Sequence, residues 1–234
     1  MPTINKKDYV TRMFDGISGK YDFLNHFLSM GIDRAWRKKA INLLKNKNPL
    51  NLLDVATGTA DMAILASVIL NPQKITGIDL SQKMLDIGYE KVKKKKLENK
   101  IALMIGDSLD LPFESNKFDA VTVAFGVRNF ENPLKGLQEM FRVLKKEGRI
   151  VILEFSVPEK RFIKPVYLFY FKKILPFIGS IFSNNDFAYS YLPVSVSKFP
   201  QGENFLILLR KAGFEKTEYK SLSLGICSIY SGIK

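Results

Sequence analysis

Three aspartates in the first half of the chain have the type and spacing of residues that bind a nucleoside. Asp54 lies in one apolar run, Asp79 ends the next one, and Asp107 follows a third together with Ser108. A carboxylate such as Asp79 at a strand end can accept hydrogen bonds from both ribose hydroxyls, and Asp107 with Ser108 can recognise the edge of an adenine. Because open α/β sheets bind ligands at the carboxyl ends of their strands, these positions predict one nucleoside site.

A tight turn after Asp54 forms the other part of this predicted site, in the sequence Asp54-Val55-Ala56-Thr57-Gly58-Thr59-Ala60. Gly58 allows the backbone to approach a ligand closely, and the helix that follows offers free N–H groups in its first turn. The G-x-G-x-x-G pattern of dinucleotide-binding proteins is missing, which argues against an NAD-dependent dehydrogenase. An acid directly before the turn would repel a pyrophosphate, so a cationic ligand is favoured.

The elements that position these residues alternate between strand and helix patterns, which predicts parallel βαβ units and a doubly wound, Rossmann-like α/β sheet. We expect five strands at 50–56, 74–79, 101–105, 118–124 and 148–154. Ser81 is a candidate N-cap for one helix, and Pro133 suits the first turn of another. Two further strand-like runs, 214–220 and 225–231, are joined too tightly for a crossover helix. They predict a C-terminal antiparallel hairpin and a total of seven strands.

One domain, 1–234, accounts for the length of the chain, and its segments differ in composition. We expect an N-terminal helical segment on the substrate side over 1–49, a cofactor-binding core over 50–154, a helical cap insertion over 155–202, and a terminal helix and hairpin over 203–234. Within the cap insertion, aromatic residues alternate with lysines over 160–173. This stretch either packs its aromatic side chains onto the domain or covers an apolar ligand, with its lysines facing anionic head groups.

The chain is basic, with 36 Lys and Arg against 23 Asp and Glu, and the excess is localised. Residues 1–50 hold 10 basic and 4 acidic side chains and residues 155–200 hold 6 and 2, so both segments favour an anionic partner. The single Cys227 excludes a disulfide framework, and the single His26 excludes a multi-histidine metal centre. Without a signal-peptide pattern or an apolar run of about 20 residues, we expect a cytoplasmic protein and no bound metal.

Six short blocks spread over almost the whole chain form a more specific pattern: YDFLN (21–25), SMGIDRAW (29–36), FGVRN (125–129), RVL (142–144), LEFS (153–156) and YSYLPVS (189–195). Together they resemble the menaquinone/ubiquinone biosynthesis C-methyltransferases, a group of class I S-adenosylmethionine-dependent methyltransferases. The resemblance implies transfer of a methyl group from S-adenosylmethionine to a ring carbon of a polyprenylated quinol. Demethylmenaquinol is the favoured substrate, and a benzoquinol of the ubiquinone pathway is the alternative.

The resemblance also implies which positions hold the cofactor. In this family they are the positions that here are Thr59, Asp79, Asp107 and Ser108, and we expect further contacts from Asp54, Gly58 and Ala124. Four positions depart from the family pattern, which usually has Gly-Gly-Thr-Gly-Asp in the turn where this chain has TGTAD (57–61). Thr57 and Ala60 replace the first and third of these glycines, Asp33 stands where a histidine is common, and Ala124 stands where some relatives have serine. Any contact from Ala124 must therefore come from its backbone.

Methyl transfer to a ring carbon requires an electron-rich substrate, so the quinol and not the quinone must react. Its phenolic hydroxyl, with an ordinary pKa of about 10, must lose its proton to a base or be stabilised as the phenolate by a cation. Arg128 follows the fourth strand beside the predicted cofactor, and the resemblance favours it as the group that stabilises the quinolate, with Asn129 orienting this corner. The alternative for Arg128 is a salt bridge with Glu131 or Glu154.

The remaining side chains of the predicted site come from the helical segments. The candidates for the base are Asp22, Asp33 and His26, although a lone histidine is more often structural than catalytic. The residues expected to line or close the substrate pocket are Tyr21, Asn25 and Tyr189.

Two other functions are compatible with a basic Rossmann-like chain. An RNA methyltransferase would place an Asn/Asp-Pro-Pro-aromatic motif after the fourth strand, where this chain has AFGVR (124–128), or would use a nucleophilic cysteine, whereas Cys227 falls in a terminal strand. A non-enzymatic membrane- or nucleic-acid-binding module would not bind S-adenosylmethionine. We therefore expect a polyprenyl quinol and, peripherally, the anionic inner face of the membrane as partners, with no nucleic acid. A homo-oligomer is left open.

Overall fold

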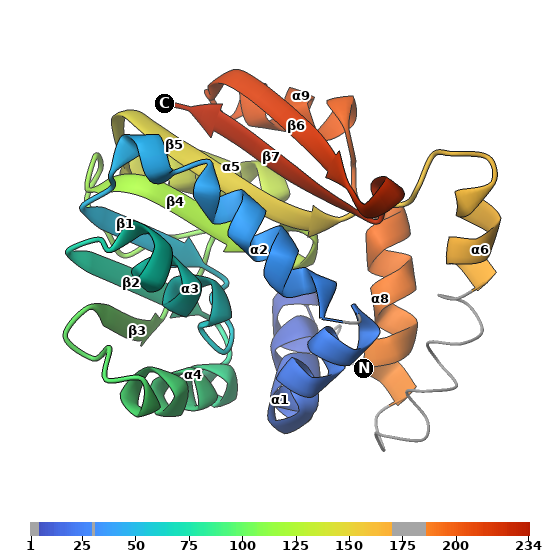
Figure 1. The fold of residues 1–234 in the computed structure, drawn as a ribbon, viewed down its shortest axis with the longest axis horizontal. Coiled ribbons are helices and arrows are strands. Elements are labelled where there is room, and N and C mark those ends of the chain that lie inside the picture. The colour runs from blue at the N-terminus through green and yellow to red at the C-terminus, as the bar shows by residue number, and fades with distance from the viewer. Residues whose placement is uncertain (1–4, 30, 170–185) are drawn as a thin grey trace.

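A seven-stranded sheet forms the centre of the protein in a computed structural model that describes residues 5–29, 31–169 and 186–234 (Figure 1). Its strands are β1 (Asn51–Val55), β2 (Lys74–Asp79), β3 (Ile101–Ile105), β4 (Phe118–Ala124), β5 (Leu144–Phe155), β6 (Glu215–Leu222) and β7 (Cys227–Ile233). They lie in the order β3-β2-β1-β4-β5-β7-β6. The first five strands are parallel, and β7 runs antiparallel to both β5 and β6. The expected Rossmann-like sheet with a C-terminal hairpin is confirmed.

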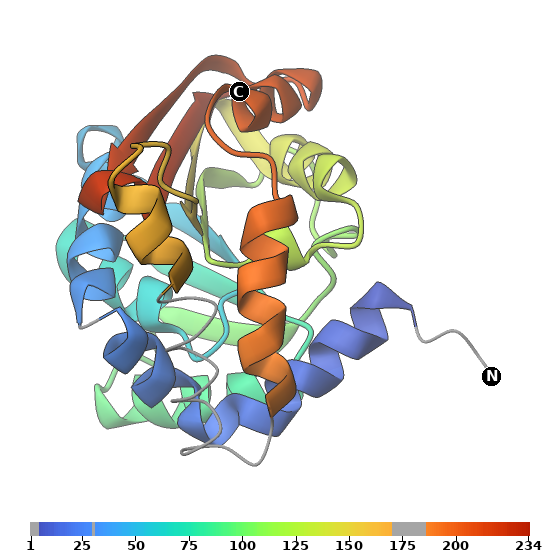
Figure 2. The ribbon, with the colours of Figure 1, turned by 90° about the vertical axis from the view of Figure 1, so that its right-hand side faces the viewer.

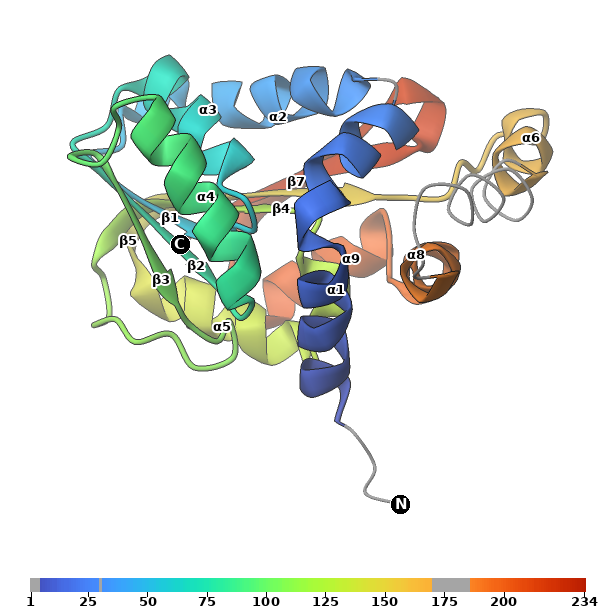
Figure 3. The same ribbon diagram turned by 90° about the horizontal axis from the view of Figure 1, so that it is seen from below.

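Helices cover both faces of this sheet. They are α1 (Lys6–Leu28), α2 (Ile32–Asn42), α3 (Asp61–Leu70), α4 (Gln82–Lys94), α5 (Pro133–Val143), α6 (Ile163–Phe169), α8 (Asp186–Lys198) and α9 (Glu203–Lys211), with short 3₁₀ turns η1 (Lys45–Lys47), η2 (Val127–Asn129) and η4 (Ser223–Gly225). The helices α2, α3 and α4 share a buried apolar cluster on one face, and α5 and α9 share another on the opposite face (Figure 3). The sheet is therefore doubly wound.

Two helices that follow strands begin where the sequence indicates. The Ser81 hydroxyl accepts a hydrogen bond from the Met84 backbone N–H at 3.2 Å and caps α4. The Asn132 side chain accepts the Lys135 N–H at 3.1 Å, and Pro133 occupies the first turn of α5. These caps satisfy backbone donors that a helix start leaves open, and they fix the loops after β2 and β4.

The fifth strand begins earlier than the expected residue 148. Leu144 already pairs with Phe118, and the register of the two strands then shifts between Phe118 and Ala120. Between these pairs Glu147 has a φ of 63°, so the strand is irregular there. The irregular part contains Lys145-Lys146-Glu147, which lacks the apolar pattern by which a strand is recognised in sequence.

Helices α1 and α8 lie at the carboxyl edge of the sheet, beyond the ends of the strands (Figure 2). Val10 and Met13 of α1 are buried, and the rings of Tyr9 in α1 and Tyr191 in α8 lie 6.0 Å apart. Helix α6 follows β5 on the same side, and residues 170–185 of the expected cap insertion lie outside the described residues. Within the described ranges, no helix is long and apolar enough to cross a membrane.

Candidate functional site

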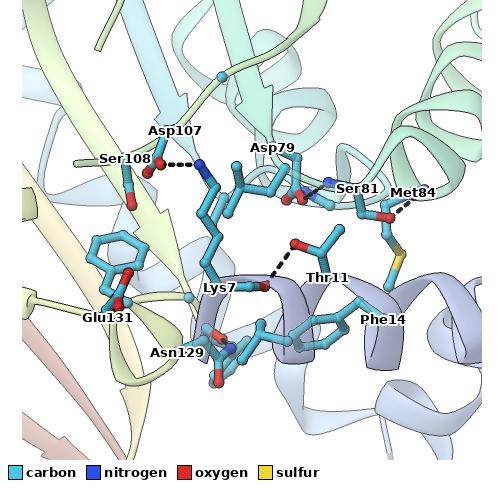
Figure 4. Close-up of a pocket in the computed structure, with 18 of the residues that line it drawn as sticks. Lys7, Thr11, Phe14, Asp79, Ser81, Met84, Asp107, Ser108, Asn129 and Glu131 are labelled. Carbon is cyan, nitrogen blue, oxygen red and sulfur yellow. Dashed lines mark hydrogen bonds and ion pairs between the residues drawn. The ribbon is translucent and has the colours of Figure 1, made fainter. Parts of the chain in front are cut away.

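A pocket of about 90 Å³ opens at the carboxyl ends of β1 to β4 and is closed on one side by α1 (Figure 4). The sequence-predicted residues that line it are Gly58, Asp79, Asp107, Ser108, Ala124, Asn129 and Tyr21. Lys7, Val10, Thr11 and Phe14 of α1 line it as well, although the sequence analysis did not single them out. The structure thus brings residues from the carboxyl ends of four strands into one cavity, among them Asp79 and Asp107 but not Asp54.

Asp79 organises the turn at the centre of the pocket. One carboxylate oxygen accepts the Gly58 N–H at 2.8 Å and the other accepts the Ser81 N–H at 2.9 Å. Burial raises the pKa of Asp79, and the backbone hydrogen bonds counteract that rise. Since each carboxylate oxygen can accept two hydrogen bonds, Asp79 keeps acceptor capacity for a ligand. A Cβ built on Gly58 would meet nothing within 4 Å, so the turn faces open space there.

The backbone around the pocket is held in left-handed conformations. The φ angle is 52° at Ala56, 55° at Gly58, 65° at Ala60 and 60° at Phe125. For a residue with a side chain this conformation costs roughly 1–2 kcal/mol, and such strain clusters at functional sites. Glycine adopts a φ of 65° without this cost, so the turn is strained at Ala60 where a glycine would not be.

Asp54 lies beneath the turn and not among the residues that line the pocket, and its contact with the cofactor stays a prediction. Its two oxygens accept hydrogen bonds from the hydroxyls of Thr57 and Thr122, both at 2.6 Å. The side chain is fully buried, and this burial raises its pKa to about 6. These two hydrogen bonds join Asp54 to the turn through Thr57 and to β4 through Thr122.

Lys7 is the most prominent pocket residue that sequence reasoning missed. Its Nζ lies 2.6 Å from the carboxylate of Asp107, whose other oxygen accepts the Leu109 N–H at 2.9 Å. Burial raises the pKa of Asp107, but the hydrogen bonds from Lys7 and Leu109 outweigh it and hold the pKa below its ordinary value. The positions 7, 10, 11 and 14 that face the pocket have helical spacing, which is the signal by which they could have been found.

Thr59 and Asp22 belong to a charged cluster outside the pocket lining. The Thr59 hydroxyl donates to Asp22 at 2.5 Å, and Lys91 of α4 contacts Asp22 at 2.9 Å and the Thr59 oxygen at 3.1 Å. Lys91 also forms an ion pair with Asp61 at the start of α3. This cluster ties α1 to the turn, and Asp22 is an ion-pair residue in it; its role as a base stays a prediction.

Asp33 likewise does not line the pocket. It is buried in α2, where one oxygen accepts the Ser29 hydroxyl at 2.8 Å and the other lies 3.6 Å from the Arg37 Nε. The predicted residues Asn25, His26 and Tyr189 lie in α1 and α8, and their side chains fall outside the described part of the chain.

Arg128 is buried in η2 and forms the salt bridge with Glu154 that the sequence analysis gave as the alternative. Its Nη1 lies 2.7 Å from a Glu154 oxygen and also donates to the Phe125 carbonyl. The Phe155 ring lies 5.4 Å from the guanidinium carbon. The buried Nε of Arg128 has no hydrogen-bond partner among the described residues. The guanidinium of Arg128 thus keeps one buried N–H, that of Nε, without an acceptor among the described residues.

Asn129 connects the pocket to α8. Its carboxamide oxygen accepts the Tyr191 hydroxyl at 3.2 Å, and burial raises the pKa of Tyr191, so that this phenol stays protonated. The sequence block that contains Tyr191 also contains Tyr189, which was the predicted pocket residue. From this block it is Tyr191 whose hydroxyl contacts the site, through Asn129.

Comparison with solved structures identifies the fold. The protein matches the [4+2]-cyclase SpnF with a TM-score of 0.71 at 18% identity, covering 98% of this chain and 96% of the other. It matches phosphoethanolamine N-methyltransferase 2 of Haemonchus contortus in complex with S-adenosyl-L-methionine with a TM-score of 0.64 at 15% identity, covering 100% of this chain and 60% of the other. At these identities the likeness concerns the fold alone.

Sequence comparison is more specific. The chain is 47% identical over 229 residues to a demethylmenaquinone methyltransferase of Bacteroides fragilis, covering 98% of this chain and 94% of the relative. It is 44% identical over 230 residues to the ubiquinone/menaquinone biosynthesis C-methyltransferase UbiE of Geotalea daltonii, covering 98% and 97%. The sequence model of the ubiE/COQ5 methyltransferase family matches residues 2–234. Since the match spans nearly the whole chain, the protein belongs to the ubiE/COQ5 methyltransferase family.

Proposed function

We propose that the protein methylates a ring carbon of demethylmenaquinol with S-adenosylmethionine and so forms menaquinol. The observation that carries this proposal is the 47% identity to a demethylmenaquinone methyltransferase over 98% of the chain. The pocket at the carboxyl edge of the sheet supports it, because Asp79, Asp107 and Asn129 line the same cavity.

The residues of the pocket fit S-adenosylmethionine, which supplies a methyl group activated by a sulfonium when it is bound. Asp79 would accept hydrogen bonds from the ribose hydroxyls while it holds Gly58 and Ser81 in place. Asp107 and Ser108 would contact the adenine, and the backbone at Ala124 would face the cofactor from β4. The open space in front of Gly58 is the room that a close approach of ligand to backbone needs.

On the substrate side, Arg128 would stabilise the quinolate. Arginine stays protonated and cannot serve as the base, so its role is that of a fixed positive charge. The ion pair with Glu154 holds the guanidinium in place, and the Nε, which lacks a partner among the described residues, leaves one donor for a substrate oxygen or a water. Asn129 and Tyr191 would orient the ring next to it.

A naphthoquinol is the proposed ring because the relatives named demethylmenaquinone methyltransferase are 45–47% identical to this chain. A benzoquinol is the second candidate, favoured by the name of the 44% identical UbiE relative, which includes both pathways. Purified protein, labelled S-adenosylmethionine and the two quinols test the choice. Label in the naphthoquinol product alone, and loss of menaquinone in a strain that lacks the gene, are expected. Methylation of the benzoquinol alone would overturn the assignment, and methylation of neither would overturn the proposed activity.

We also propose that the protein binds peripherally to an anionic membrane surface, from which a quinol with an apolar tail must arrive. Phe162 is 87% exposed and Phe169 is 61% exposed, at the two ends of the α6 region. Lys160, Arg161 and Lys164 lie exposed beside them. Exposed aromatic rings next to basic residues are typical of segments that lie at a bilayer interface. This would place the enzyme in the cytoplasm at the inner face of the membrane.

A further inference from the structure

The side chain of Lys7 reaches across the pocket from α1 to the group expected to recognise adenine. Figure 4 shows Lys7 ending at Asp107, with Asp79 and Ser81 on the far side of the cavity. The ammonium lies 2.6 Å from the carboxylate oxygen that the Leu109 N–H does not use. An adenine amino group that approached this Asp107 oxygen would therefore meet the Lys7 ammonium, and would have to share the oxygen with it or displace it.

The size of the cavity agrees with this occupation. The pocket encloses about 90 Å³, whereas pockets that hold drug-sized ligands usually enclose about 300–1,000 Å³. A nucleoside joined to an amino acid is a ligand of that larger class. A ligand of that class would therefore need the room that the Lys7 side chain takes up across the pocket.

We propose that Lys7 competes with the adenine for Asp107, so that cofactor binding exchanges the Lys7 ammonium for the adenine amino group. This inference rests on the proposed binding of S-adenosylmethionine. Lys7 thereby becomes a residue that sets cofactor affinity, although it lies outside the strand-end motifs that form the site.

The contacts around Lys7 show why the exchange is feasible without unfolding α1. The side chains of Lys7 and Asp107 are 40% and 23% exposed, so the pair resembles a surface ion pair, worth about 0.2–1 kcal/mol. The helix has anchors that do not involve this pair, since Lys6 donates to the Phe130 carbonyl at 2.5 Å and Asp15 accepts the Ser81 hydroxyl. Breaking the Lys7 contact therefore leaves α1 docked.

Calorimetric titration with S-adenosylhomocysteine tests the competition on the whole protein, with two variants that each remove one positive charge from the same helix turn. Lys7→Met should bind about two- to fivefold more tightly than the wild type, which is the upper part of the pair energy expressed as a ratio. Lys6→Met removes a neighbouring anchor that does not touch Asp107, and its affinity should equal that of the wild type. Raising the salt concentration should narrow the difference between Lys7→Met and the wild type, because salt screens the half-exposed pair.

The possible outcomes separate this inference from the proposed function. Unchanged or weaker binding by Lys7→Met overturns the competition, since Lys7 would then be indifferent or would help to hold the ligand. Equal tightening in Lys7→Met and Lys6→Met also overturns it, because the docking of α1 and not the Asp107 contact would limit binding. If the folded wild type and both variants bind no S-adenosylhomocysteine, the cofactor assignment itself fails.

Discussion

Truncating Arg128 should have two separable consequences, because the residue is both buried and charged. Arg128→Ala leaves Glu154, which is fully buried, without its cation. Removing one partner of a buried ion pair costs about 3–5 kcal/mol, since the other charge remains uncompensated. For a chain of this size each kcal/mol lowers the melting temperature by about 2–4 °C. We therefore expect Arg128→Ala to melt roughly 6–20 °C below the wild type in calorimetry.

The catalytic consequence should survive when the stability is restored. In Arg128→Met/Glu154→Gln the uncompensated charge is gone, so most of the lost stability should return. A remainder is expected because the Gln side chain has one acceptor oxygen, whereas the two Glu154 oxygens accept the backbone N–H groups of Arg128 and Phe155. Loss of a preorganised electrostatic partner typically lowers turnover about 100- to 1,000-fold, and both variants should show this loss per folded molecule.

Methyl incorporation into demethylmenaquinol, measured well below the melting temperature of each variant, decides between the two roles. Turnover of both variants should rise with pH more steeply than that of the wild type, because the quinol then ionises without a cation. Arg128→Lys keeps the charge without the planar fork and should recover part of the rate. Near-normal turnover of the stable double variant would refute the reasoning, since Arg128 would then act only as the partner of Glu154.

Three further predictions follow from individual contacts. Asp79→Ala should weaken S-adenosylhomocysteine binding by roughly 1.5–3 kcal/mol, the range for hydrogen bonds to a charged group, and an unchanged calorimetric Kd would remove Asp79 from the site. Burial raises the pKa of Asp54 from 3.8 to about 6, so its protonated form favours the fold, and the free energy of unfolding in urea should fall as the pH rises from about 4 to about 6. Asp54→Asn should lack this fall. Replacing Lys160 and Lys164 by Gln should weaken sedimentation with anionic vesicles by about 1 kcal/mol per charge, and unaltered sedimentation would favour packing of this stretch onto the domain.

Local sequence was sufficient to predict the sheet and the residues at its strand ends. Apolar runs bounded by turn residues give the strands, and Ser81 and Pro133 mark helix starts that the structure reproduces. Asp79 ends one such strand and Asp107 comes shortly after another. Local sequence patterns were therefore enough to place both aspartates at the carboxyl edge of the sheet. The prediction that β5 begins at residue 148 was wrong. The strand already includes the charged residues Lys145-Lys146-Glu147, and its pairing with β4 is irregular there.

Contacts between distant elements could not be predicted in the same way. Lys7 reaches Asp107 only because α1 packs across the carboxyl edge of the sheet. The helical spacing of positions 7, 10, 11 and 14 marks one face of α1, but it does not show which part of the sheet that face packs against. Tyr191 contacts Asn129 because of the way α8 is rotated about its own axis. A sequence block with two tyrosines does not show which of them faces the site. For Arg128 the sequence predicted two alternative roles, a salt bridge and stabilisation of the quinolate. The structure contains the salt bridge, which Arg128 forms with the buried Glu154. The role toward the quinolate stays a prediction.

The chemistry of this family must be encoded outside the shared sheet. A protein named as a [4+2]-cyclase and one named as an N-methyltransferase have the same fold as this chain at 18% and 15% identity, so the fold alone does not determine a reaction. Two parts of this protein go beyond what a nucleoside site requires. They are η2, with Arg128 and Asn129, and the helices α1 and α8 at the carboxyl edge of the sheet. Because Asn129 both lines the pocket and accepts the Tyr191 hydroxyl, the pocket at the strand ends and helix α8 meet at this residue. If Arg128 stabilises the quinolate as proposed, η2 holds both the residue that acts on the substrate and the residue that joins the pocket to α8.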